Sequence, residues 1–469
     1  MSERAVTFAL TESLWHKLAR ALDDNREVAG VLSAKLVDVG DGVITLLGRT
    51  LTWAPEDCYA SRSADGLALT SAGWVYAARA ALAEDSVVVF VHTHPHGQPV
   101  FSRRDDTVDE ALVQAIAGMS GHARYAALVI AGTPVKPAIA GRVYRQPPVA
   151  AGDPNCVDGP GQPIPVGRFR VLGDRLQVFD GGQQSFADDV FDRQVRAFGR
   201  EGQAILAGLH AGVVGAGGTG SAVAEQLGRL GIGRLTLVDD DIVTAATPTR
   251  GYGISTRDTG RAKAAVLAEH IEQIGLGTVV APVIGQVQDI EARRALAHAD
   301  VLFSCVDGHG ARLILNRWAY AHLVPVIDIA VLVDANDGVI AGIDGRLTWL
   351  APGTACLLCR GRLDPARAYA EMLDPADRHR LAGEGYAVEA GTPQPAVVSL
   401  TSMVSSLAVT EVLMRLFGLA DPTPTEMLVR VADRDVRKNR LPQRQGCFCS
   451  DPGYSGRGFA EPHLDLMWP

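Results

Sequence analysis

Apolar and polar positions follow two different patterns along the chain. In the first 145 residues, short strand-like runs are mixed with segments whose apolar residues recur at helical spacing. We expect strands at 4–11, 30–39, 42–53, 86–94 and 124–132, and helices at 14–22, 73–84 and 106–119. This mixture predicts an α+β domain over residues 1–145.

Farther along, strands and helices alternate regularly. The sequence predicts strands at 210–217, 234–241, 278–285 and 300–307, with helices at 221–231 and 262–275 between them. Such alternation is typical of a parallel sheet with helical crossovers. We therefore expect a chain of the α/β class, in which residues 186–450 form a Rossmann-like, mostly parallel domain.

The two predicted domains are separated by a region without apolar periodicity. Pro and Gly dominate residues 146–167, and we interpret 146–185 as a linker. The Gly-rich residues 451–469 are expected to form a loosely ordered tail. Two domains also agree with a length of 469 residues, because single cores stop growing at roughly 250–300 residues.

Composition narrows the function classes. The net charge of −9 comes without a basic stripe, which argues against a nucleic-acid partner. The N-terminal residues lack the apolar core of a signal peptide, and we find no uninterrupted apolar run of membrane-spanning length, so we expect a cytoplasmic protein without membrane contact. Four of the seven cysteines form two close pairs, which favours metal binding in a reducing compartment.

A candidate metal site lies in the first domain. His92 and His94 are two residues apart at the end of a predicted strand, so their imidazoles project from the same face. Asp105 falls in the first turn of the next helix if Ser102 begins it. Two imidazoles and a carboxylate suit zinc with an open fourth position. His-x-His is also common without metal, and Ser102-x-x-Asp105 also fits a helix capping box.

Together these residues spell His-Thr-His-Pro followed by Ser102 and Asp105, which resembles the JAMM motif of the JAB/MPN (Mov34/PAD-1) metallopeptidases. The resemblance implies that His92, His94 and Asp105 bind catalytic zinc and that Ser102 stabilises an oxyanion. It also implies that Glu27 is the general base for a zinc-bound water, whose pKa falls to about 7. Alternatively, Glu27 is an exposed salt-bridge residue.

A candidate nucleotide site lies in the second domain. Gly215, Gly217 and Gly220 form G-x-G-x-x-G between a strand and a helix, a pattern that binds phosphates, and Asp239 follows where an acid could bind ribose. An NAD-dependent dehydrogenase would share these features. The further cluster of Arg250, Lys263 and Asp307 favours acyl adenylation, which needs cations on the α-phosphate and an acid for Mg²⁺.

Residues 191–449, from FDRQVRAFG through VDDDIV and GRAKA to CVDGHGAR and beyond, resemble the ThiF/MoeB/ubiquitin-activating-enzyme family. The resemblance implies ATP as substrate, Mg²⁺ on Asp307, and Arg193 acting as an arginine finger from a second protomer, hence a homodimer. The implied nucleotide-binding residues are Gly215, Gly217, Gly218, Gly220, Asp239, Asp241, Arg250, Lys263 and Asp307. Thr247 replaces the family's Asn, so one ATP contact is expected to change.

The cysteine pairs fit the same resemblance. Cys356 and Cys359 match half of the family's structural zinc clip, whereas Cys447 and Cys449 have one residue between them instead of two, a spacing expected to strain tetrahedral geometry. Residues 361–446 contain no Cys, although conjugating family members carry a nucleophile there. Cys305, Cys58 and the linker's Cys156 are expected to be non-catalytic, so the chain would stop at the acyl-adenylate or pass it to another protein's thiol.

We therefore expect a bifunctional enzyme. The first domain would process the C-terminus of a ubiquitin-like or sulfur-carrier protein ending in Gly, and the second would adenylate that terminus with ATP. A conjugating enzyme is a further expected partner if the pathway modifies proteins, for example in antiviral defence. The alternatives are sulfur-carrier activation for biosynthesis and, from another class, a non-catalytic scaffold.

Overall fold

A computed structural model describes residues 5–120, 124–145, 162–180, 186–187, 189–336, 339–373, 377, 395–419, 424–460 and 464. The chain divides into two compact units. Unit 1 comprises Met1–Val171 and two short later segments, Phe179–Gly181 and Gly456–Gly458. Unit 2 comprises Leu172–Val178, Gly182–Ser455 and Phe459–Pro469.

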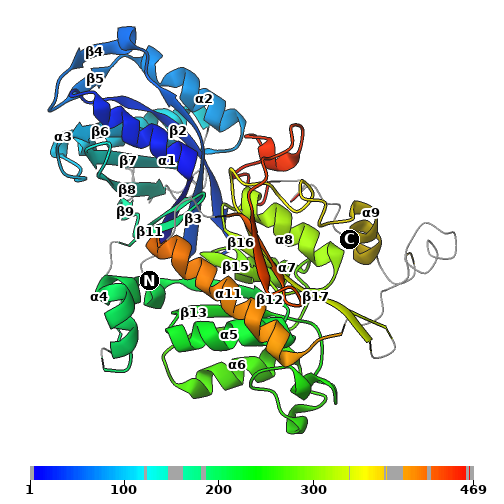
Figure 1. Cartoon of the computed structure of the whole chain (residues 1–469). Coiled ribbons are helices and arrows are strands. Elements are labelled where there is room, and N and C mark those ends of the chain that lie inside the picture. The colour runs from blue at the N-terminus through cyan, green and yellow to red at the C-terminus, as the bar shows by residue number, and fades with distance from the viewer. Residues whose placement is uncertain are drawn as a thin grey trace, which may run out of the picture. The chain divides into compact units, whose positions relative to one another are not determined.

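Unit 1 contains most of a nine-stranded mixed sheet in the order β11-β10-β1-β3-β2-β6-β7-β8-β9, although only the last two residues of β11 are counted with this unit (Figure 1). Its strands are β1 (Ala5–Thr11), β2 (Ala29–Asp38), β3 (Val43–Trp53), β6 (Val87–Pro95), β7 (Arg124–Gly132), β8 (Pro137–Arg145), β9 (Ile164–Pro165), β10 (Arg168–Leu172) and β11 (Leu176–Asp180). The helices are α1 (Glu12–Arg20), α2 (Val75–Ala83) and α3 (Arg103–Ser120). A separate hairpin joins β4 (Tyr59–Arg62) to β5 (Leu67–Leu69).

Strand alternation sorts the core of unit 1 into two layers. In β6, Val87, Val89 and Val91 pack in the cluster that contains α1. Val88 and Phe90 pack in the opposite cluster, which contains α2 and α3. The same alternation, continued by two and four residues, directs His92 and His94 toward the face that α3 covers.

The predicted linker is wrong for part of its length. Within 146–185, the structure has strands β9, β10 and β11, and Phe169 and Val171 are buried in the core of unit 1. Two five-residue strands around a Gly173–Arg175 turn suffice to bury apolar side chains, although Pro and Gly nearby hide their periodicity. Residues 146–161, including Cys156, lie outside the described residues.

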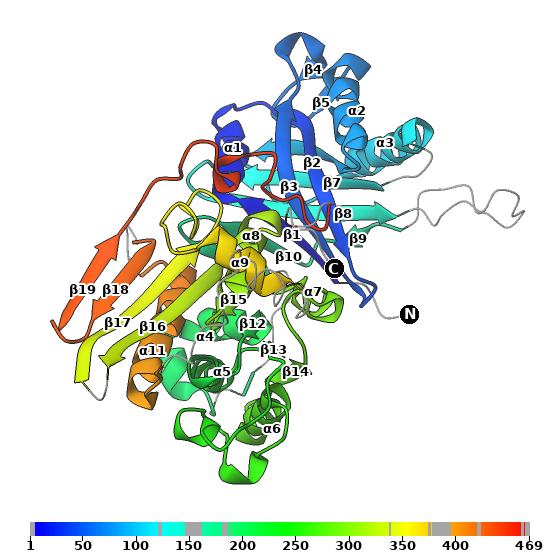
Figure 2. The same cartoon turned by 90° about the vertical axis from the view of Figure 1, so that its right-hand side faces the viewer.

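Unit 2 is a Rossmann-like fold with an antiparallel extension. Its sheet has the order β14-β13-β12-β15-β16-β17-β18-β19, with parallel pairing from β14 to β16 and antiparallel pairing beyond (Figure 2). The strands are β12 (His210–Val214), β13 (Arg234–Val238), β14 (Val279–Val283), β15 (Val301–Ser304), β16 (Val326–Asn336), β17 (Val339–Leu350), β18 (Glu426–Arg430) and β19 (Asp435–Asn439). The helices are α4 (Asp192–Gly208), α5 (Gly218–Leu230), α6 (Lys263–Ile274), α7 (Ile290–Leu296), α8 (His309–Ala321), α9 (Pro365–Met372) and α11 (Val398–Phe417).

Helices cover both faces of this sheet. Helices α5, α6 and α11 pack on one face and α7 and α8 on the other. Figure 1 shows α11 running alongside α5. Of the described helices, α11 alone is long and apolar enough to cross a membrane, but Val404, Ala408 and Val409 are buried in the core of unit 2. This burial is what a core helix requires, so its composition gives no support for a membrane span.

The C-terminal region is more ordered than expected over its first ten residues. Tyr454 is buried in the core of unit 2, and the ring of Phe459 packs edge-on against that of Trp318. Leu464 is fully buried in the same core. The aromatic and aliphatic residues scattered among the glycines explain this packing, which glycine content alone does not indicate.

Candidate active sites

The register of two antiparallel strands brings together a candidate metal-binding cluster in unit 1, formed by His92, His94 and Asp105 and called the metal cluster below. Ala29 of β2 faces His92 of β6, so continuing the register places Glu27 opposite His94. The backbone follows this pairing, because Thr93 donates its N–H to the carbonyl oxygen of Val28 at 2.9 Å. The loop after β6 then leads to α3, whose first turn carries Asp105. Three segments distant in sequence therefore supply one site.

The cluster has dimensions that fit a zinc ion. The Nε2 atoms of His92 and His94 lie 3.1 Å apart, and His92 Nε2 lies 3.3 Å from Asp105 Oδ1. Tetrahedral ligands at zinc–nitrogen bonds of about 2.0–2.1 Å lie about 3.4 Å from one another. His94 Nδ1 lies 3.2 Å from the carbonyl oxygen of Gln98, a contact that, with Nδ1 as donor, leaves Nε2 free to bind metal. The predicted ligands thus converge as a zinc site requires.

Glu27 is buried beside this cluster and is not an exposed salt-bridge residue. Its Oε1 lies 3.8 Å from His94 Nε2, and burial raises its pKa to about 7, with smaller effects from His92 and Asp105. Its backbone is fixed by the β4–β5 hairpin, since Arg62 Nε donates to its carbonyl oxygen at 2.7 Å and its N–H donates to Ser63. A carboxylate held in this position can accept a proton from a water near the cluster.

Ser102 and Asp105 hold each other in a reciprocal arrangement. The Ser102 N–H donates to Asp105 Oδ2 at 2.6 Å, and the Asp105 N–H donates to Ser102 Oγ at 3.3 Å. This is the geometry of the capping box that the spacing also allowed. Burial opposes ionisation of Asp105, but the contact with His92 and, to a smaller extent, the bonds to Ser102 hold the pKa of its carboxyl below its usual range. The cap therefore orients a candidate metal ligand and keeps it ionised.

A buried polar network under α3 was not foreseen from the sequence. Asp109, which is 2% exposed, accepts hydrogen bonds from Tyr125 Oη at 2.5 Å and from Arg142 Nε at 2.7 Å. Arg142 also donates to Asp106 at 2.6 Å and lies 3.9 Å above the Phe101 ring. An available signal was Asp109 itself, an acid within the apolar stripe of a helix. The network anchors the turn that carries Asp105.

The cluster opens into a pocket of about 480 Å³. The metal-cluster residues and Ser102 line it together with side chains from β5, α2 and α3. These other lining residues include Leu67, Leu69, Trp74, Phe90, Arg104, Val108 and Leu112. A substrate therefore has space next to the candidate zinc position.

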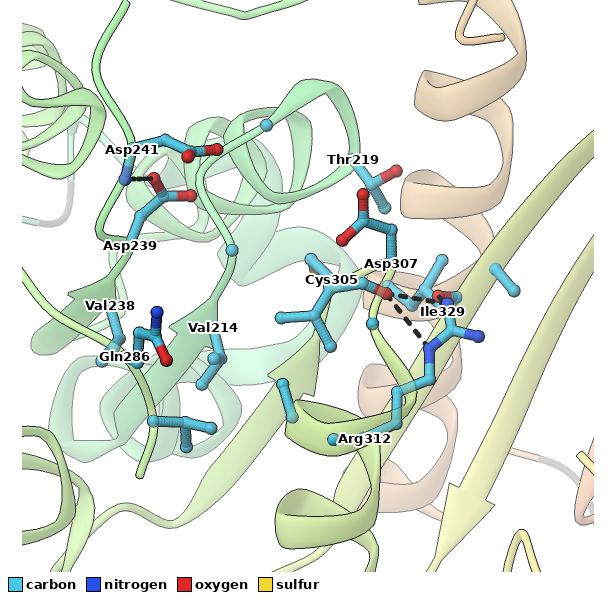
Figure 3. A pocket seen from close by; sticks show the side chains of 18 of the residues that line it. Val214, Thr219, Val238, Asp239, Asp241, Gln286, Cys305, Asp307, Arg312 and Ile329 are labelled. Atoms are coloured by element: carbon cyan, nitrogen blue, oxygen red, sulfur yellow. Dashed lines mark hydrogen bonds between the residues drawn. The ribbon is translucent and has the colours of Figure 1, made fainter. Parts of the chain in front are cut away.

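The second site is a pocket of about 670 Å³ at the carboxyl ends of the parallel strands of unit 2. It is lined by residues that follow β12, β13 and β15, at the point where the strand order reverses. Figure 3 shows Asp239 and Asp241 at one end of this pocket and Thr219 and Asp307 at the other. This is where open α/β sheets bind nucleotides.

The glycine loop has the close packing that phosphate binding requires. A Cβ atom at Gly220 would lie 1.7 Å from the carbonyl oxygen of Gly215, and Gly215 itself has a φ of 94°. A Cβ at Gly217 would meet nothing within 4 Å, so this position faces open space. Helix α5 begins here without a side-chain cap, which leaves its first N–H groups for an anion.

Charged side chains surround the loop as expected. Asp239 Oδ2 accepts the N–H of Ala216 at 2.6 Å, and burial raises the pKa of Asp239 despite this bond. Lys263 is 8% exposed and its Nζ lies 2.6 Å from Asp241 Oδ2. Arg250 and Asp307 line the same pocket. The structure thus brings together the acids and cations that the sequence singled out.

Family comparison assigns a family model to each of the two regions that contain these sites. Residues 191–449 match the model of the ThiF family, and residues 11–142 match that of prokaryotic homologs of the JAB domain. The first match covers more than half of the chain. The chain belongs to the ThiF family. Its ThiF region implies ATP use and decides against the dinucleotide dehydrogenase that the glycines alone would also fit.

Individual proteins are similar to the ThiF region. Molybdopterin-synthase adenylyltransferase of Escherichia coli is 26% identical over 262 residues, which is 55% of this chain and 94% of that protein. Sulfur carrier protein ThiS adenylyltransferase of Escherichia coli is 27% identical over 152 residues, 32% of this chain and 57% of that protein. A crystal structure of E. coli MccB aligns with a TM-score of 0.44 at 16% identity, covering 58% of this chain and 74% of that one.

Two expected residues of the ThiF region lie away from the pocket. Thr247 is 1% exposed and its Oγ1 accepts the N–H of Thr244 at 2.9 Å, so it stabilises the loop before Arg250 and is not among the described residues that line the pocket. Arg193 is exposed on α4 and does not line it either. Arg312, which sequence reasoning missed, donates to the carbonyl oxygens of Val306 and Ile329 and so ties the Asp307 loop to β16.

The four cysteines of the ThiF region converge. Sulfur atoms of Cys356 and Cys447 lie 3.6 Å apart, as do those of Cys359 and Cys449, and all four lie within 4.8 Å of one another. Tetrahedral zinc with bonds of about 2.3 Å would set its sulfurs about 3.8 Å apart. The short Cys447–Cys449 spacing therefore does not prevent a tetrahedral set.

Cys305 lines the nucleotide pocket immediately after β15. Burial raises the pKa of its thiol well above the usual range, with a smaller contribution from Asp328. Because the thiolate is the nucleophilic form, a thiol in this setting is inert at neutral pH. The raised pKa of its thiol thus disfavours Cys305 as the acceptor of an acyl group.

Proposed function

We propose that unit 2 adenylates the C-terminal Gly carboxylate of a ubiquitin-like or sulfur-carrier protein. The observation that carries this proposal is the single pocket in which Arg250, Lys263 and Asp307 lie with the glycine loop. The names of the two adenylyltransferases reported above support it. A peptidase or a redox enzyme would not need two cations, Arg250 and Lys263, beside an acid such as Asp307 that could bind Mg²⁺.

The reaction forms a bond between a carboxylate oxygen of the carrier and the α-phosphorus of ATP. The bond between that phosphorus and the oxygen bridging to the β-phosphate breaks, and pyrophosphate leaves. Arg250 and Lys263 would offset the negative charge on the phosphates, and Asp239 would bind the ribose. Asp307 would hold Mg²⁺, which would neutralise phosphate charge when bound.

Pyrophosphate exchange into ATP, stimulated by a Gly-ended carrier, tests this function. Wild-type protein should catalyse exchange, and Asp307→Ala should lower it by at least about 100-fold because one magnesium ligand and its charge are lost. Asp433→Ala is the matched control, since Asp433 pairs with Arg430 outside the pocket. Exchange that survives Asp307→Ala would refute the assignment of this pocket.

We further propose that unit 1 is a zinc-dependent peptidase acting on the same carrier. His92, His94 and Asp105 would bind the zinc ion, which would lower the pKa of a water. Glu27 would accept a proton from that water and deliver it to the departing nitrogen, and Ser102 would stabilise the oxyanion. Support comes from the dimensions of the cluster and from the buried position of Glu27.

Carrier precursors extended beyond their terminal Gly test the peptidase function. Zinc-loaded wild-type protein should remove the extension, and Glu27→Gln should bind zinc but hydrolyse at least about 100-fold more slowly, as loss of a general base requires. Glu110→Gln, an exposed change on α3, is the control. If the wild-type protein shows neither hydrolysis nor pyrophosphate exchange, the alternative of a non-catalytic scaffold is favoured instead.

The fate of the adenylate distinguishes the two pathway hypotheses. A thiocarboxylate formed on the carrier when a sulfur donor is supplied indicates sulfur-carrier activation, which the ThiS adenylyltransferase similarity favours. Transfer to a cysteine of a conjugating enzyme indicates protein modification. Mass spectrometry of the carrier separates these products.

Assembly through unit 2 belongs to the same proposal. Arg193 would reach the nucleotide of a second protomer, because it lies outside the pocket of its own chain. Mixing Arg193→Ala with Asp307→Ala protein should restore partial exchange if the sites are shared, since mixed dimers contain one intact site. Absence of restoration in proven mixed dimers would remove this role.

A further inference from the structure

Part of the lining of the unit 1 pocket is apolar. Its wall is formed by side chains from β5, the start of α2, β6 and α3. These side chains are Leu67, Leu69, Trp74, Phe90, Val108 and Leu112. A substrate with only Gly on both sides of the cleaved bond would leave this wall in contact with water, whereas a large apolar side chain would cover it.

One arginine adds a polar element to the same pocket. Arg104 lies on the first turn of α3 next to Asp105, and its Nη2 donates to the carbonyl oxygen of Leu67 at 2.9 Å. This bond holds the guanidinium against the β4–β5 hairpin, whose Gly66 has no side chain: a Cβ there would lie 2.7 Å from Arg104 Nη1. A guanidinium so placed can bind a carboxylate through its remaining N–H groups.

The other charged residues that line the pocket are acids. Asp105 belongs to the metal cluster, Glu27 lies beside it, and Asp65 lies at the tip of the hairpin. Arg104 is the one arginine or lysine among the described residues that line the pocket. A ligand with an apolar side chain and one carboxylate would therefore cover the wall and also satisfy this cation.

We propose that this pocket selects the residue removed from the carrier: a single C-terminal residue with a large apolar side chain, whose α-carboxylate binds Arg104. This proposal rests on the peptidase function proposed above. In the reaction, the water oxygen bonds to the carbonyl carbon of the Gly before this residue, and the carbon–nitrogen bond breaks. The departing amine takes the proton that Glu27 accepted. The products are a free apolar amino acid and a carrier that ends in a Gly carboxylate.

Substrates that differ at one position test the selection. Carriers ending in Gly-Gly-Leu, Gly-Gly-Gly and Gly-Gly-Leu-amide are compared by kcat/KM with zinc-loaded enzyme. We expect the Leu substrate to exceed the Gly substrate by about 10–200-fold, the range that one apolar side chain supplies. Amidation should lower kcat/KM by about 10-fold or more. Equal values for Leu and Gly would overturn the proposal.

Variants of the lining residues locate the effect. Arg104→Gln should abolish the difference between the acid and the amide, whereas Arg103→Gln, the exposed neighbouring arginine outside the pocket, should preserve it. Val108→Trp, at a position 38% exposed at the pocket, should narrow the space and lower the ratio of Leu to Gly hydrolysis. An acid-to-amide ratio that survives Arg104→Gln would remove Arg104 from the proposal.

A binding measurement separates this proposal from the peptidase function itself. Zinc-loaded Glu27→Gln should bind Gly-Gly-Leu peptide at least about 10-fold more tightly than Gly-Gly-Gly or the amide, measured by calorimetry. If wild type hydrolyses all substrates without preference, the pocket assignment fails and the peptidase stands. If nothing is hydrolysed but this binding order holds, the peptidase function fails and the pocket assignment stands.

Discussion

The network of Asp109 and Arg142 should control both the local stability of α3 and the metal affinity of unit 1. Asp109→Leu removes the acceptor of Tyr125 and of Arg142 and leaves a buried guanidinium with Asp106 alone, an acid that is itself half exposed. Breaking a buried ion pair by removing one partner costs about 3–5 kcal/mol. Asp105 lies one turn before Asp109, so loss of the anchor should also loosen this candidate metal ligand.

Replacing both partners should be much less damaging. Burial raises the pKa of Asp109 although Tyr125 and Arg142 oppose the shift, so the surroundings disfavour its charged form overall. An apolar pair therefore removes the desolvation cost of both charges along with their attraction. In a double-mutant cycle with Arg142→Met, we expect a favourable coupling of about 2–3 kcal/mol. Asp106, Tyr125 and Tyr144 limit the recovery because each loses a hydrogen-bond partner.

Local measurements are needed because two compact units do not unfold as one two-state system. Hydrogen exchange of peptides covering 103–120 and 137–145 reports the local free energy, and competition with a chelating dye reports zinc affinity. We expect Asp109→Leu to lower zinc affinity by about 10–100-fold, as loss of supporting hydrogen bonds does in metal sites. Glu110→Leu is the control on the exposed face of α3. A local cost below about 1 kcal/mol, or unchanged zinc affinity despite faster exchange, would refute the anchoring role.

Three further predictions concern unit 2. Gly220→Ala should abolish ATP binding and lower Tm because its Cβ would lie 1.7 Å from the Gly215 carbonyl oxygen, whereas Gly217→Ala should leave Tm unchanged; calorimetry and thermal melts decide. Cys449→Ser should reduce bound zinc by one equivalent in elemental analysis, and Cys58→Ser should not. Burial lowers the pKa of His210 to about 4, so protonation of this imidazole favours the unfolded state. The free energy of unfolding should therefore fall by up to about 3 kcal/mol from pH 6.5 to pH 4. In urea melts, His210→Gln should show a smaller loss over this pH range.

Local patterns in the sequence predicted most of the individual site residues, but not which distant segments come together in space. Strand alternation placed His92 and His94 on one face, and the capping spacing placed Asp105 in a first helical turn, because both relations span few residues. The position of Glu27 depends on the register between β2 and β6, which are far apart in sequence. No local rule specifies that register, so only the resemblance indicated Glu27.

Other features escaped prediction for the same reason. Asp109 interrupts an apolar stripe, which signals a buried polar contact. Its partner Arg142, however, lies on β8, the second element after α3 along the chain. The replacement of the family's Asn by Thr247 was expected to change one ATP contact, but the sequence did not indicate that the Thr247 hydroxyl bonds within its own loop. The strands β10 and β11 are short, and Pro and Gly next to them conceal the alternation.

The two proposed reactions have complementary requirements at the carrier C-terminus, and these requirements fix their order. Unit 2 needs a free Gly carboxylate, so an extended precursor is not its substrate. Unit 1, as proposed, needs an apolar terminal residue with a free carboxylate for Arg104, so the trimmed carrier no longer fills its pocket. The acyl-adenylate is a reactive anhydride, so a zinc peptidase site that admitted it would hydrolyse it. Its nucleotide is large, polar and anionic, however, and an apolar wall of Leu67, Trp74 and Phe90 would disfavour it. Selectivity in unit 1 would thus protect the product of unit 2.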